Sequence, residues 1–248
     1  MTSPLFAAGE FRGTMAQRNF ISLTALRDQI RDDFDRIALV SQDDWDHNGH
    51  YHRFLLNQVP ERCAQALDIG CGTGVFSRLL AARLDQVLGL DLSPEMIIAA
   101  RDRSQAFTNI DFQIADFLES DLPESHFDVI VSIAAMHHLP LAETLTRIKR
   151  ALKPNGVMLI LDLYKAETVM DFLVCASAVP LNIVFNLYKN HRAREPKEKR
   201  QAWAEHGQRD VYQKLSQIRE ISSRVMPGSR LQRHLFWRYS LVWQKPEP

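Results

Sequence analysis

Cysteine is scarce in this sequence of 248 residues, which has only Cys63, Cys71 and Cys175 and no Cys-x-x-Cys spacing. So few thiols, odd in number, exclude a disulfide framework and a cysteine-based zinc site, and predict a reducing, cytoplasmic compartment. We therefore expect no bound metal. The first residues show no basic segment followed by an apolar run, which predicts no secretory signal. No apolar stretch reaches the roughly 20 residues of a membrane span.

Net charge is also absent, because 30 Lys and Arg balance 30 Asp and Glu. The two kinds of charge are distributed unevenly along the chain. Residues 1–188 carry 16 basic against 24 acidic side chains, and residues 189–248 carry 14 against 6. Nucleic-acid enzymes usually show a basic stripe around the active face. Here the basic surplus lies in the C-terminal part, away from the motifs described below, so we expect no nucleic-acid partner.

The most informative stretch is 65–80, where a short apolar run ends in an acid and leads into an amphipathic helix. Three glycines lie between the two: Gly70, Gly72 and Gly74. Such a turn exposes amide groups at a helix N-terminus and lets a ligand approach the main chain. The dinucleotide fingerprint G-x-G-x-x-G would need glycine at position 75, where the chain has Val75. A nicotinamide dehydrogenase is therefore disfavoured.

The run Leu67-Asp68-Ile69-Gly70-Cys71-Gly72-Thr73-Gly74 resembles the first motif of class I S-adenosylmethionine-dependent methyltransferases. Lys153-Pro154-Asn155-Gly156 also matches this family, and the segment 233–243 resembles the last strands of its type 11 small-molecule enzymes. The resemblance covers residues 62 to 163 strongly and the flanks more weakly. It implies S-adenosyl-L-methionine as cofactor, S-adenosyl-L-homocysteine as product and a small-molecule methyl acceptor.

The predicted fold class is α/β: a doubly wound seven-stranded sheet in the order 3-2-1-4-5-7-6, with the last strand antiparallel. Hydrophobic patterns place the strands at 66–69, 86–91, 111–117, 127–132, 156–163, 231–236 and 239–243. We expect a helical cover over residues 1–60, a Rossmann-like domain over 61–248 and a helical cap inserted at about 165–210. The chain is expected to be a monomer or a homodimer.

Acids at the ends of the first three strands are the main cofactor candidates. Asp91, at the tip of the second strand, can accept both ribose hydroxyls. The resemblance implies that Asp68 meets the methionine amino group and that Asp116 accepts the adenine amino group. Further residues are expected around the cofactor: Tyr51, His52, Gly70, Cys71, Gly72, Gly74, Leu92, Met96, Phe117 and Ile133.

Histidines supply the catalytic candidates. The segment 43–56 is dense in histidine and aromatic residues, and it is either a surface amphipathic helix or a helix over the pocket. The second interpretation places Trp45 and His50 near the substrate and makes His47 a possible base. His137, after the fourth strand, is the other candidate base and substrate contact. As a metal site the segment is weak, since no matching acid or cysteine pattern accompanies its histidines.

The stretch 172–188 is largely apolar and is followed by a basic segment, 189–200. Three interpretations stay open: a helical cap over the active site, a packing helix, or an interfacial membrane contact through 172–200. At the level of function, the alternatives to a small-molecule methyltransferase are a non-catalytic S-adenosylmethionine-binding protein of the same fold and a lipid methyltransferase at a membrane surface.

Overall fold

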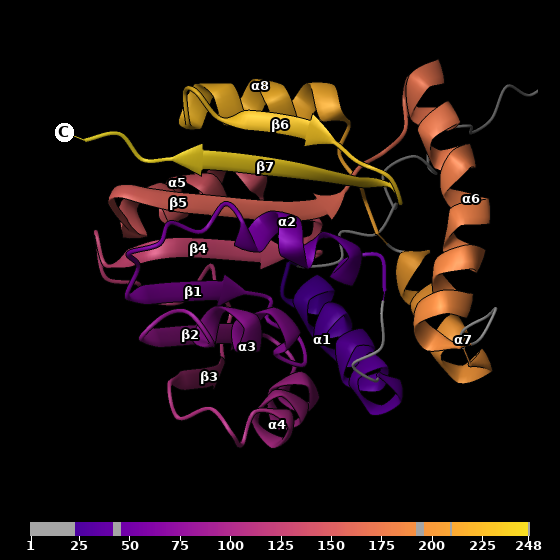
Figure 1. Cartoon of the computed structure of the whole chain (residues 1–248), viewed down its shortest axis with the longest axis horizontal. Coiled ribbons are helices and arrows are strands. Elements are labelled where there is room, and N and C mark those ends of the chain that lie inside the picture. Colours follow the sequence, from indigo (N-terminus) through magenta and orange to yellow (C-terminus); the bar gives the residue numbers. More distant parts are fainter. Residues whose placement is uncertain (1–22, 42–45, 192–195, 209, 248) are drawn as a thin grey trace, which may run out of the picture.

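Seven strands form one sheet in the computed structural model, which describes residues 23–41, 46–191, 196–208 and 210–247 (Figure 1). Their order, β3-β2-β1-β4-β5-β7-β6, confirms the predicted topology. β1 to β5 are parallel, while β7 runs antiparallel to both β5 and β6. The strands are β1 (Gln65–Ile69), β2 (Gln86–Asp91), β3 (Ile110–Ile114), β4 (Phe127–Ile133), β5 (Leu152–Leu163), β6 (Arg230–Arg233) and β7 (Arg238–Gln244).

Helices connect and flank these strands. Those before β3 are α1 (Leu23–Val40), the short 3-10 turn η1 (Gly49–Tyr51), α2 (His52–Leu56), α3 (Val75–Ala81) and α4 (Pro94–Arg103). The later ones are η2 (Met136–His138), α5 (Leu141–Ala151), α6 (Val169–Asn190), α7 (Lys197–Gly207) and α8 (Leu215–Val225). α4 shows why they begin where they do: Ser93 caps its N-terminus by accepting the Met96 N–H at 3.1 Å, and Pro94 occupies the first turn.

The central strands are buried on both faces, as parallel strands between helices require. In β4, Ile130 packs into one apolar core with α5 and α8. Its neighbours Val129 and Val131 point the other way and pack with α2 and α3. Adjacent residues on a strand face opposite sides of a sheet, so the nearly continuous apolar sequence of β4 supplies both cores.

Several element boundaries differ from the predictions; β5, for example, begins at Leu152 rather than at residue 156. β3 ends at Ile114, so Asp116 and Phe117 lie in the loop that follows. β6 ends at Arg233, because Phe236 and Trp237 take positive φ angles of 57° and 56° that turn the chain into β7. The apolar spacing of Val211, Leu215, Ile218, Ile221 and Val225 predicts a last helix from residue 211. This helix begins only at Leu215, since the preceding backbone pairs with Lys165 instead.

Helices α1, α6 and α7 lie beyond the carboxyl ends of the parallel strands (Figure 1). α1 packs against both α4 and α7. α6 contains Pro180 and continues as a helix through it. Among the helices that the structure describes, none combines the length and apolar character needed to cross a membrane.

Candidate active site

The turn between β1 and α3 contains the three glycines, and their roles differ. Gly70, Gly72 and Gly74 have φ angles of 68°, 53° and 75°, which residues with a side chain rarely adopt. A Cβ on Gly74 would lie 2.7 Å from Phe112 Cζ, so packing alone requires glycine there. A Cβ on Gly72 would meet only Met96 Sδ, at 4.0 Å. Gly72 is therefore the position where a ligand can approach the main chain.

Asp91, the last residue of β2, holds this turn in place. Its Oδ2 accepts the N–H of Gly72 at 2.8 Å, and its Oδ1 accepts the N–H of Ser93 at 2.9 Å. Burial raises the pKa of Asp91, although these backbone hydrogen bonds oppose the rise. Since each carboxylate oxygen has two lone pairs, Asp91 can still accept hydrogen bonds from a ligand.

Asp68 of β1 is also buried, and its Oδ2 accepts the hydroxyl of Ser77 at 2.6 Å. Burial raises the pKa of Asp68 to about 7; the hydrogen bond from Ser77 opposes this rise, and the charge of Asp91 adds to it. A ligand cation beside Asp68 would favour the ionised carboxylate. The site therefore suits an ammonium group.

Asp116 lies at the same edge of the sheet, in the loop after β3. Its Oδ1 accepts the N–H of Leu118 at 2.8 Å, and its Oδ2 lies 3.1 Å from Nε of Arg27 in α1. Arg27 also pairs with Glu119. These contacts fasten α1 over the loop.

A cavity of about 940 Å³ opens along this edge. That volume is near the upper end of the ~300–1,000 Å³ typical of ligand pockets, which leaves room for more than one small ligand. Most of the residues predicted to form the site line it: His47, His52, Asp68, Gly70, Cys71, Gly72, Asp91, Leu92, Met96, Asp116, Phe117 and Ile133.

Tyr51 and His50, predicted near the cofactor and the substrate, do not line this cavity. The short turn η1 directs Tyr51 into the core, where its hydroxyl donates to the carbonyl of Leu235 at 3.1 Å. His50 packs edge-on against Tyr51 and Phe185. Gly74 also lies outside the lining. The prediction for Trp45 concerns a residue outside the described ranges.

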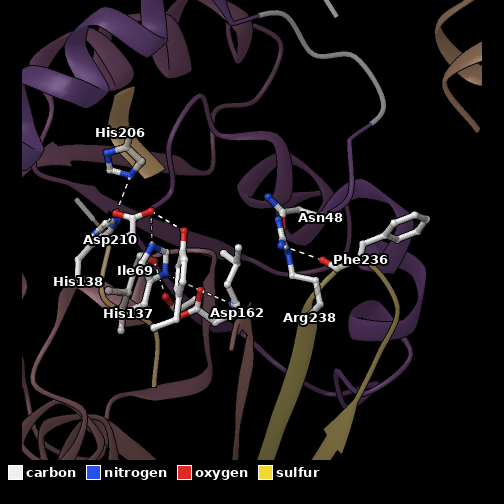
Figure 2. Close-up of polar contacts among 12 residues, drawn as sticks. Asn48, Ile69, His137, His138, Asp162, His206, Asp210, Phe236 and Arg238 are labelled. Carbon is white, nitrogen blue, oxygen red and sulfur yellow. Dashed lines mark hydrogen bonds and ion pairs between the residues drawn. The ribbon is translucent and has the colours of Figure 1, made fainter. Parts of the chain in front are cut away.

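His137 lies behind the cavity wall, and its neighbour His138 lines the cavity instead. His137 Nδ1 is 2.7 Å from Asp162 Oδ1, and its Nε2 is 3.7 Å from Asp210 Oδ2 (Figure 2). Burial by itself would lower the pKa of His137, but the two carboxylates outweigh it and raise the pKa. The ring of His137 is thus turned toward these acids, and His137 is not among the residues that line the cavity.

His47 remains as an imidazole on the cavity wall. Its Nε2 lies 2.9 Å from Oδ1 of Asn182 in α6, and its ring stacks on Phe236 with 4.7 Å between ring centroids. These two contacts hold the imidazole in place on the cavity wall.

Arg238, at the start of β7, brings a buried positive charge to the same wall. Its Nε donates to Asn48 Oδ1 at 2.8 Å and its Nη1 donates to the carbonyl of Phe236 at 3.1 Å (Figure 2). Burial lowers the pKa of Arg238 while nearby acids oppose this. The described residues give the guanidinium no ion pair within 4.0 Å, so its charge is compensated only at longer range.

Comparison with known proteins finds similarity to methyltransferases. Residues 66–156 match a family model described as a methyltransferase domain. An uncharacterized methyltransferase of Mycobacterium tuberculosis (strain ATCC 25618 / H37Rv) is 28% identical over 205 residues, which cover 82% of this chain and 98% of that protein. Trans-aconitate 2-methyltransferase of Deinococcus radiodurans is 39% identical over 112 residues, covering 44% of this chain and 42% of that protein.

Solved structures share the architecture. Phosphoethanolamine N-methyltransferase 2 of Haemonchus contortus, in complex with phosphomonomethylethanolamine and S-adenosylhomocysteine, superposes with a TM-score of 0.62 at 17% identity. The superposition covers 92% of this chain and 61% of that one. The chain is a class I S-adenosylmethionine-dependent methyltransferase.

Several residues of the methyltransferase's cavity were not predicted. Arg27 and Phe34 of α1, Trp203 of α7, and Arg238 all line it. Each comes from a segment whose position over the strand ends is set by tertiary packing. Asp162, which lies behind His137 near the end of the fifth strand, was also not predicted. Its position could have been noticed in the sequence, because the first two strands also have acids near their carboxyl ends.

Proposed function

We propose that this methyltransferase moves a methyl group from S-adenosylmethionine, by in-line displacement, to an O, N or C nucleophile of an anionic small molecule. The proposal rests on one observation. One cavity is lined both by the glycine turn with Asp91 and by His47, Asn182 and Arg238. We assign the first group to the cofactor (the glycine-turn end) and the second to the acceptor (the acceptor end).

The residues at the glycine-turn end fit the cofactor. Asp68 would face its ammonium group, the amides around Gly72 would hold its methionine part, and Asp91 would accept the ribose hydroxyls. The open space beside Gly72 supports this assignment, since a Cβ there would extend toward the ligand.

The adenine would lie farther along the same edge. Leu92, Met96 and Phe117 supply apolar surface there, and Asp116 would accept the amino group of the ring. His52 and Ile133 would border the methionine part and the reacting sulfur.

The cofactor supplies a methyl group on a positively charged sulfur, which is already an activated leaving group. The chain's own residues therefore have to align the nucleophile and exclude water. Helices α1, α6 and α7 each contribute residues to the cavity wall and so shield it. His47 would accept the proton that the nucleophile loses.

Arg238 indicates the charge of the acceptor. A buried guanidinium that no described carboxylate pairs with favours a ligand carboxylate or phosphate, which it can bind with two parallel hydrogen bonds. The similarity to a trans-aconitate methyltransferase is consistent with this, because that enzyme's named substrate is a carboxylic acid.

A second candidate is an amphiphilic lipid acceptor, favoured by one face of α6. Large apolar side chains there are strongly exposed, among them Phe172 (61%), Leu173 (59%) and Val184 (59%). Such a face can lie in a membrane interface without spanning it. Co-sedimentation with lipid vesicles that is lost in Phe172→Ser/Leu173→Ser would support this candidate, and an absence of vesicle binding by the unmodified chain would remove it.

The first test is calorimetric titration with S-adenosylhomocysteine. We expect the unmodified chain and the control Asp111→Ala, on the exposed side of β3, to bind alike. Asp91→Ala should lose at least about 100-fold in affinity, because it removes the ribose acceptor and leaves two backbone donors unsatisfied. Carboxylate- and phosphate-bearing acceptors are then screened with labelled methyl donor. Cofactor binding without transfer to any anionic acceptor would contradict the proposed substrate class.

A further inference from the structure

Three imidazoles surround one carboxylate beside the cavity. His137 and His138 come from η2, His206 from α7, and Asp210 from the chain just after α7. One ligand atom from each of the four can be chosen so that all lie within 4.8 Å of one another. Figure 2 shows Asp210 between His206 and His137, with His138 beside them. All four side chains are about nine-tenths buried or more.

The spacing within this group is too long for hydrogen bonds. Asp210 Oδ1 lies 3.5 Å from His206 Nε2 and 3.9 Å from His138 Nδ1, while Asp210 Oδ2 lies 3.7 Å from His137 Nε2. Hydrogen bonds between such groups are about 2.7–3.2 Å long. Two ligands that share a tetrahedral zinc ion, each about 2.1 Å from it, are by contrast about 3.4 Å apart. The three separations from Asp210 are therefore close to those of groups that share an ion.

The ring nitrogens of His137 and His206 that point away from Asp210 face other acids, as is usual for metal ligands. His137 directs Nδ1 to Asp162 at a hydrogen-bond distance of 2.7 Å, and His206 turns Nδ1 toward Asp33 at a longer distance of 3.4 Å. Both rings consequently turn Nε2 toward Asp210. The carboxylate is oriented in turn by Tyr212, whose hydroxyl donates to Oδ2 at 2.6 Å. An acid behind a metal-binding histidine orients its ring, and His137 and His206 each have one.

His138 lacks the partners that a buried imidazole needs. Within the described residues neither ring nitrogen makes a hydrogen bond, and its Nε2 is fully buried. An unsatisfied buried polar group of this kind costs about 1–3 kcal/mol. A metal ion would satisfy one nitrogen by direct coordination.

We propose that His137, His138, His206 and Asp210 bind a divalent transition-metal ion of the zinc class. Four protein ligands fill a tetrahedral shell, which is the arrangement of structural rather than catalytic zinc sites. The ion would fasten the end of α7 to the turn after β4, and so hold α7 over the cavity. The sequence suggested no such site because no cysteines take part and the ligands come from two distant segments.

The test uses tag-free protein freed of metal with a chelator, and Zn²⁺ as the probe. Equilibrium dialysis should give one ion per chain, and Co²⁺ in its place should show the visible absorption of a tetrahedral site. We expect His206→Gln and Asp210→Asn each to weaken Zn²⁺ binding by more than about 100-fold. Asp162→Asn, behind His137, should weaken it by about 10- to 100-fold.

His126→Gln is the matched control, since His126 is exposed and lies outside the cluster. It should bind Zn²⁺ like the unmodified chain. Circular dichroism and S-adenosylhomocysteine binding check that each variant is folded, independently of the metal. Sub-stoichiometric Zn²⁺ binding by folded, unmodified protein would overturn the proposal, as would equal affinity in a folded His206→Gln or Asp210→Asn variant.

Discussion

The glycine-turn end of the cavity is built from one continuous part of the chain. Asp68, Asp91 and Asp116 follow one another at or near the ends of β1, β2 and β3, and backbone amides complete the set. The acceptor end combines His47, Asn182 and Arg238, which all line the same cavity but are far apart in sequence.

Because of this difference, the residues at one end of the cavity can change without affecting those at the other end. The first end depends on turns and strand tips that also hold the sheet together. The second depends on segments added around the sheet, whose side chains can change without altering the strand ends. Variants at the two ends should therefore separate cofactor binding from the handling of the acceptor.

The largest effect is expected from His47→Gln, at the acceptor end. Loss of a general base typically costs about 10²–10⁴-fold in turnover. Binding of S-adenosylhomocysteine should stay within about threefold of the unmodified chain. Methyl transfer is measured with labelled donor and the best acceptor from the screen, with His126→Gln as control. Unchanged turnover would exclude His47 as the base.

Arg238→Gln should affect the acceptor but not the cofactor. Hydrogen bonds to charged groups contribute about 1.5–3 kcal/mol, so KM for an anionic acceptor should rise by about 10- to 100-fold. Arg238→Lys keeps the positive charge and should therefore raise KM less than Arg238→Gln does. Asn48→Ala removes only one partner of the guanidinium and controls for local packing. A fall in cofactor affinity equal to the rise in KM would show that the two ends are not separable.

At the cofactor end, binding should depend on pH through Asp68. The ammonium of the ligand favours the carboxylate, so binding releases a proton below the raised pKa of about 7. Affinity for S-adenosylhomocysteine should then rise by up to about tenfold per pH unit below pH 7 and level off above it. Asp68→Asn should remove this dependence. A flat profile in the unmodified chain would mean that Asp68 does not meet the ammonium group.

The raised pKa of Asp68 affects the stability of the ligand-free chain in the opposite direction, so that stability falls as pH rises. The folded-state pKa of Asp68 lies above the ordinary value of about 3.9. Its contribution to stability is therefore greatest below pH ~4 and is lost as pH rises through 7. Denaturant unfolding of the unmodified chain and of Asp68→Asn at several pH values measures this contribution to the free energy of unfolding.

The smallest effect is expected from Arg27→Ala, which removes the ion pair between α1 and Asp116. Arg27 is 34% exposed, and such pairs contribute about 0.2–1 kcal/mol. Cofactor affinity should change by less than about fivefold. A loss of more than about 30-fold would make α1 part of the cofactor site rather than a cover over it.

Much of the fold could be predicted because its signals are local. Apolar runs, glycine turns and caps such as Ser93 fix where strands and helices form, and the resemblance to a known family supplied the strand order. The loop containing Asp116 was misassigned to a strand because alternating residues continue past the last paired position. The turn at Phe236 was missed because positive φ at an aromatic residue is imposed by packing rather than by preference.

The candidate site divides in the same way. The order of the residues alone determined the glycine turn and its acids, since strand, turn and helix are contiguous and their geometry is set within a few residues. Only the tertiary structure decided that His138 rather than His137 faces the cavity, that Arg238 reaches its wall, and that His206 meets His137 around Asp210. Those placements depend on how distant segments pack over the strand ends, and that packing is a property of the whole chain.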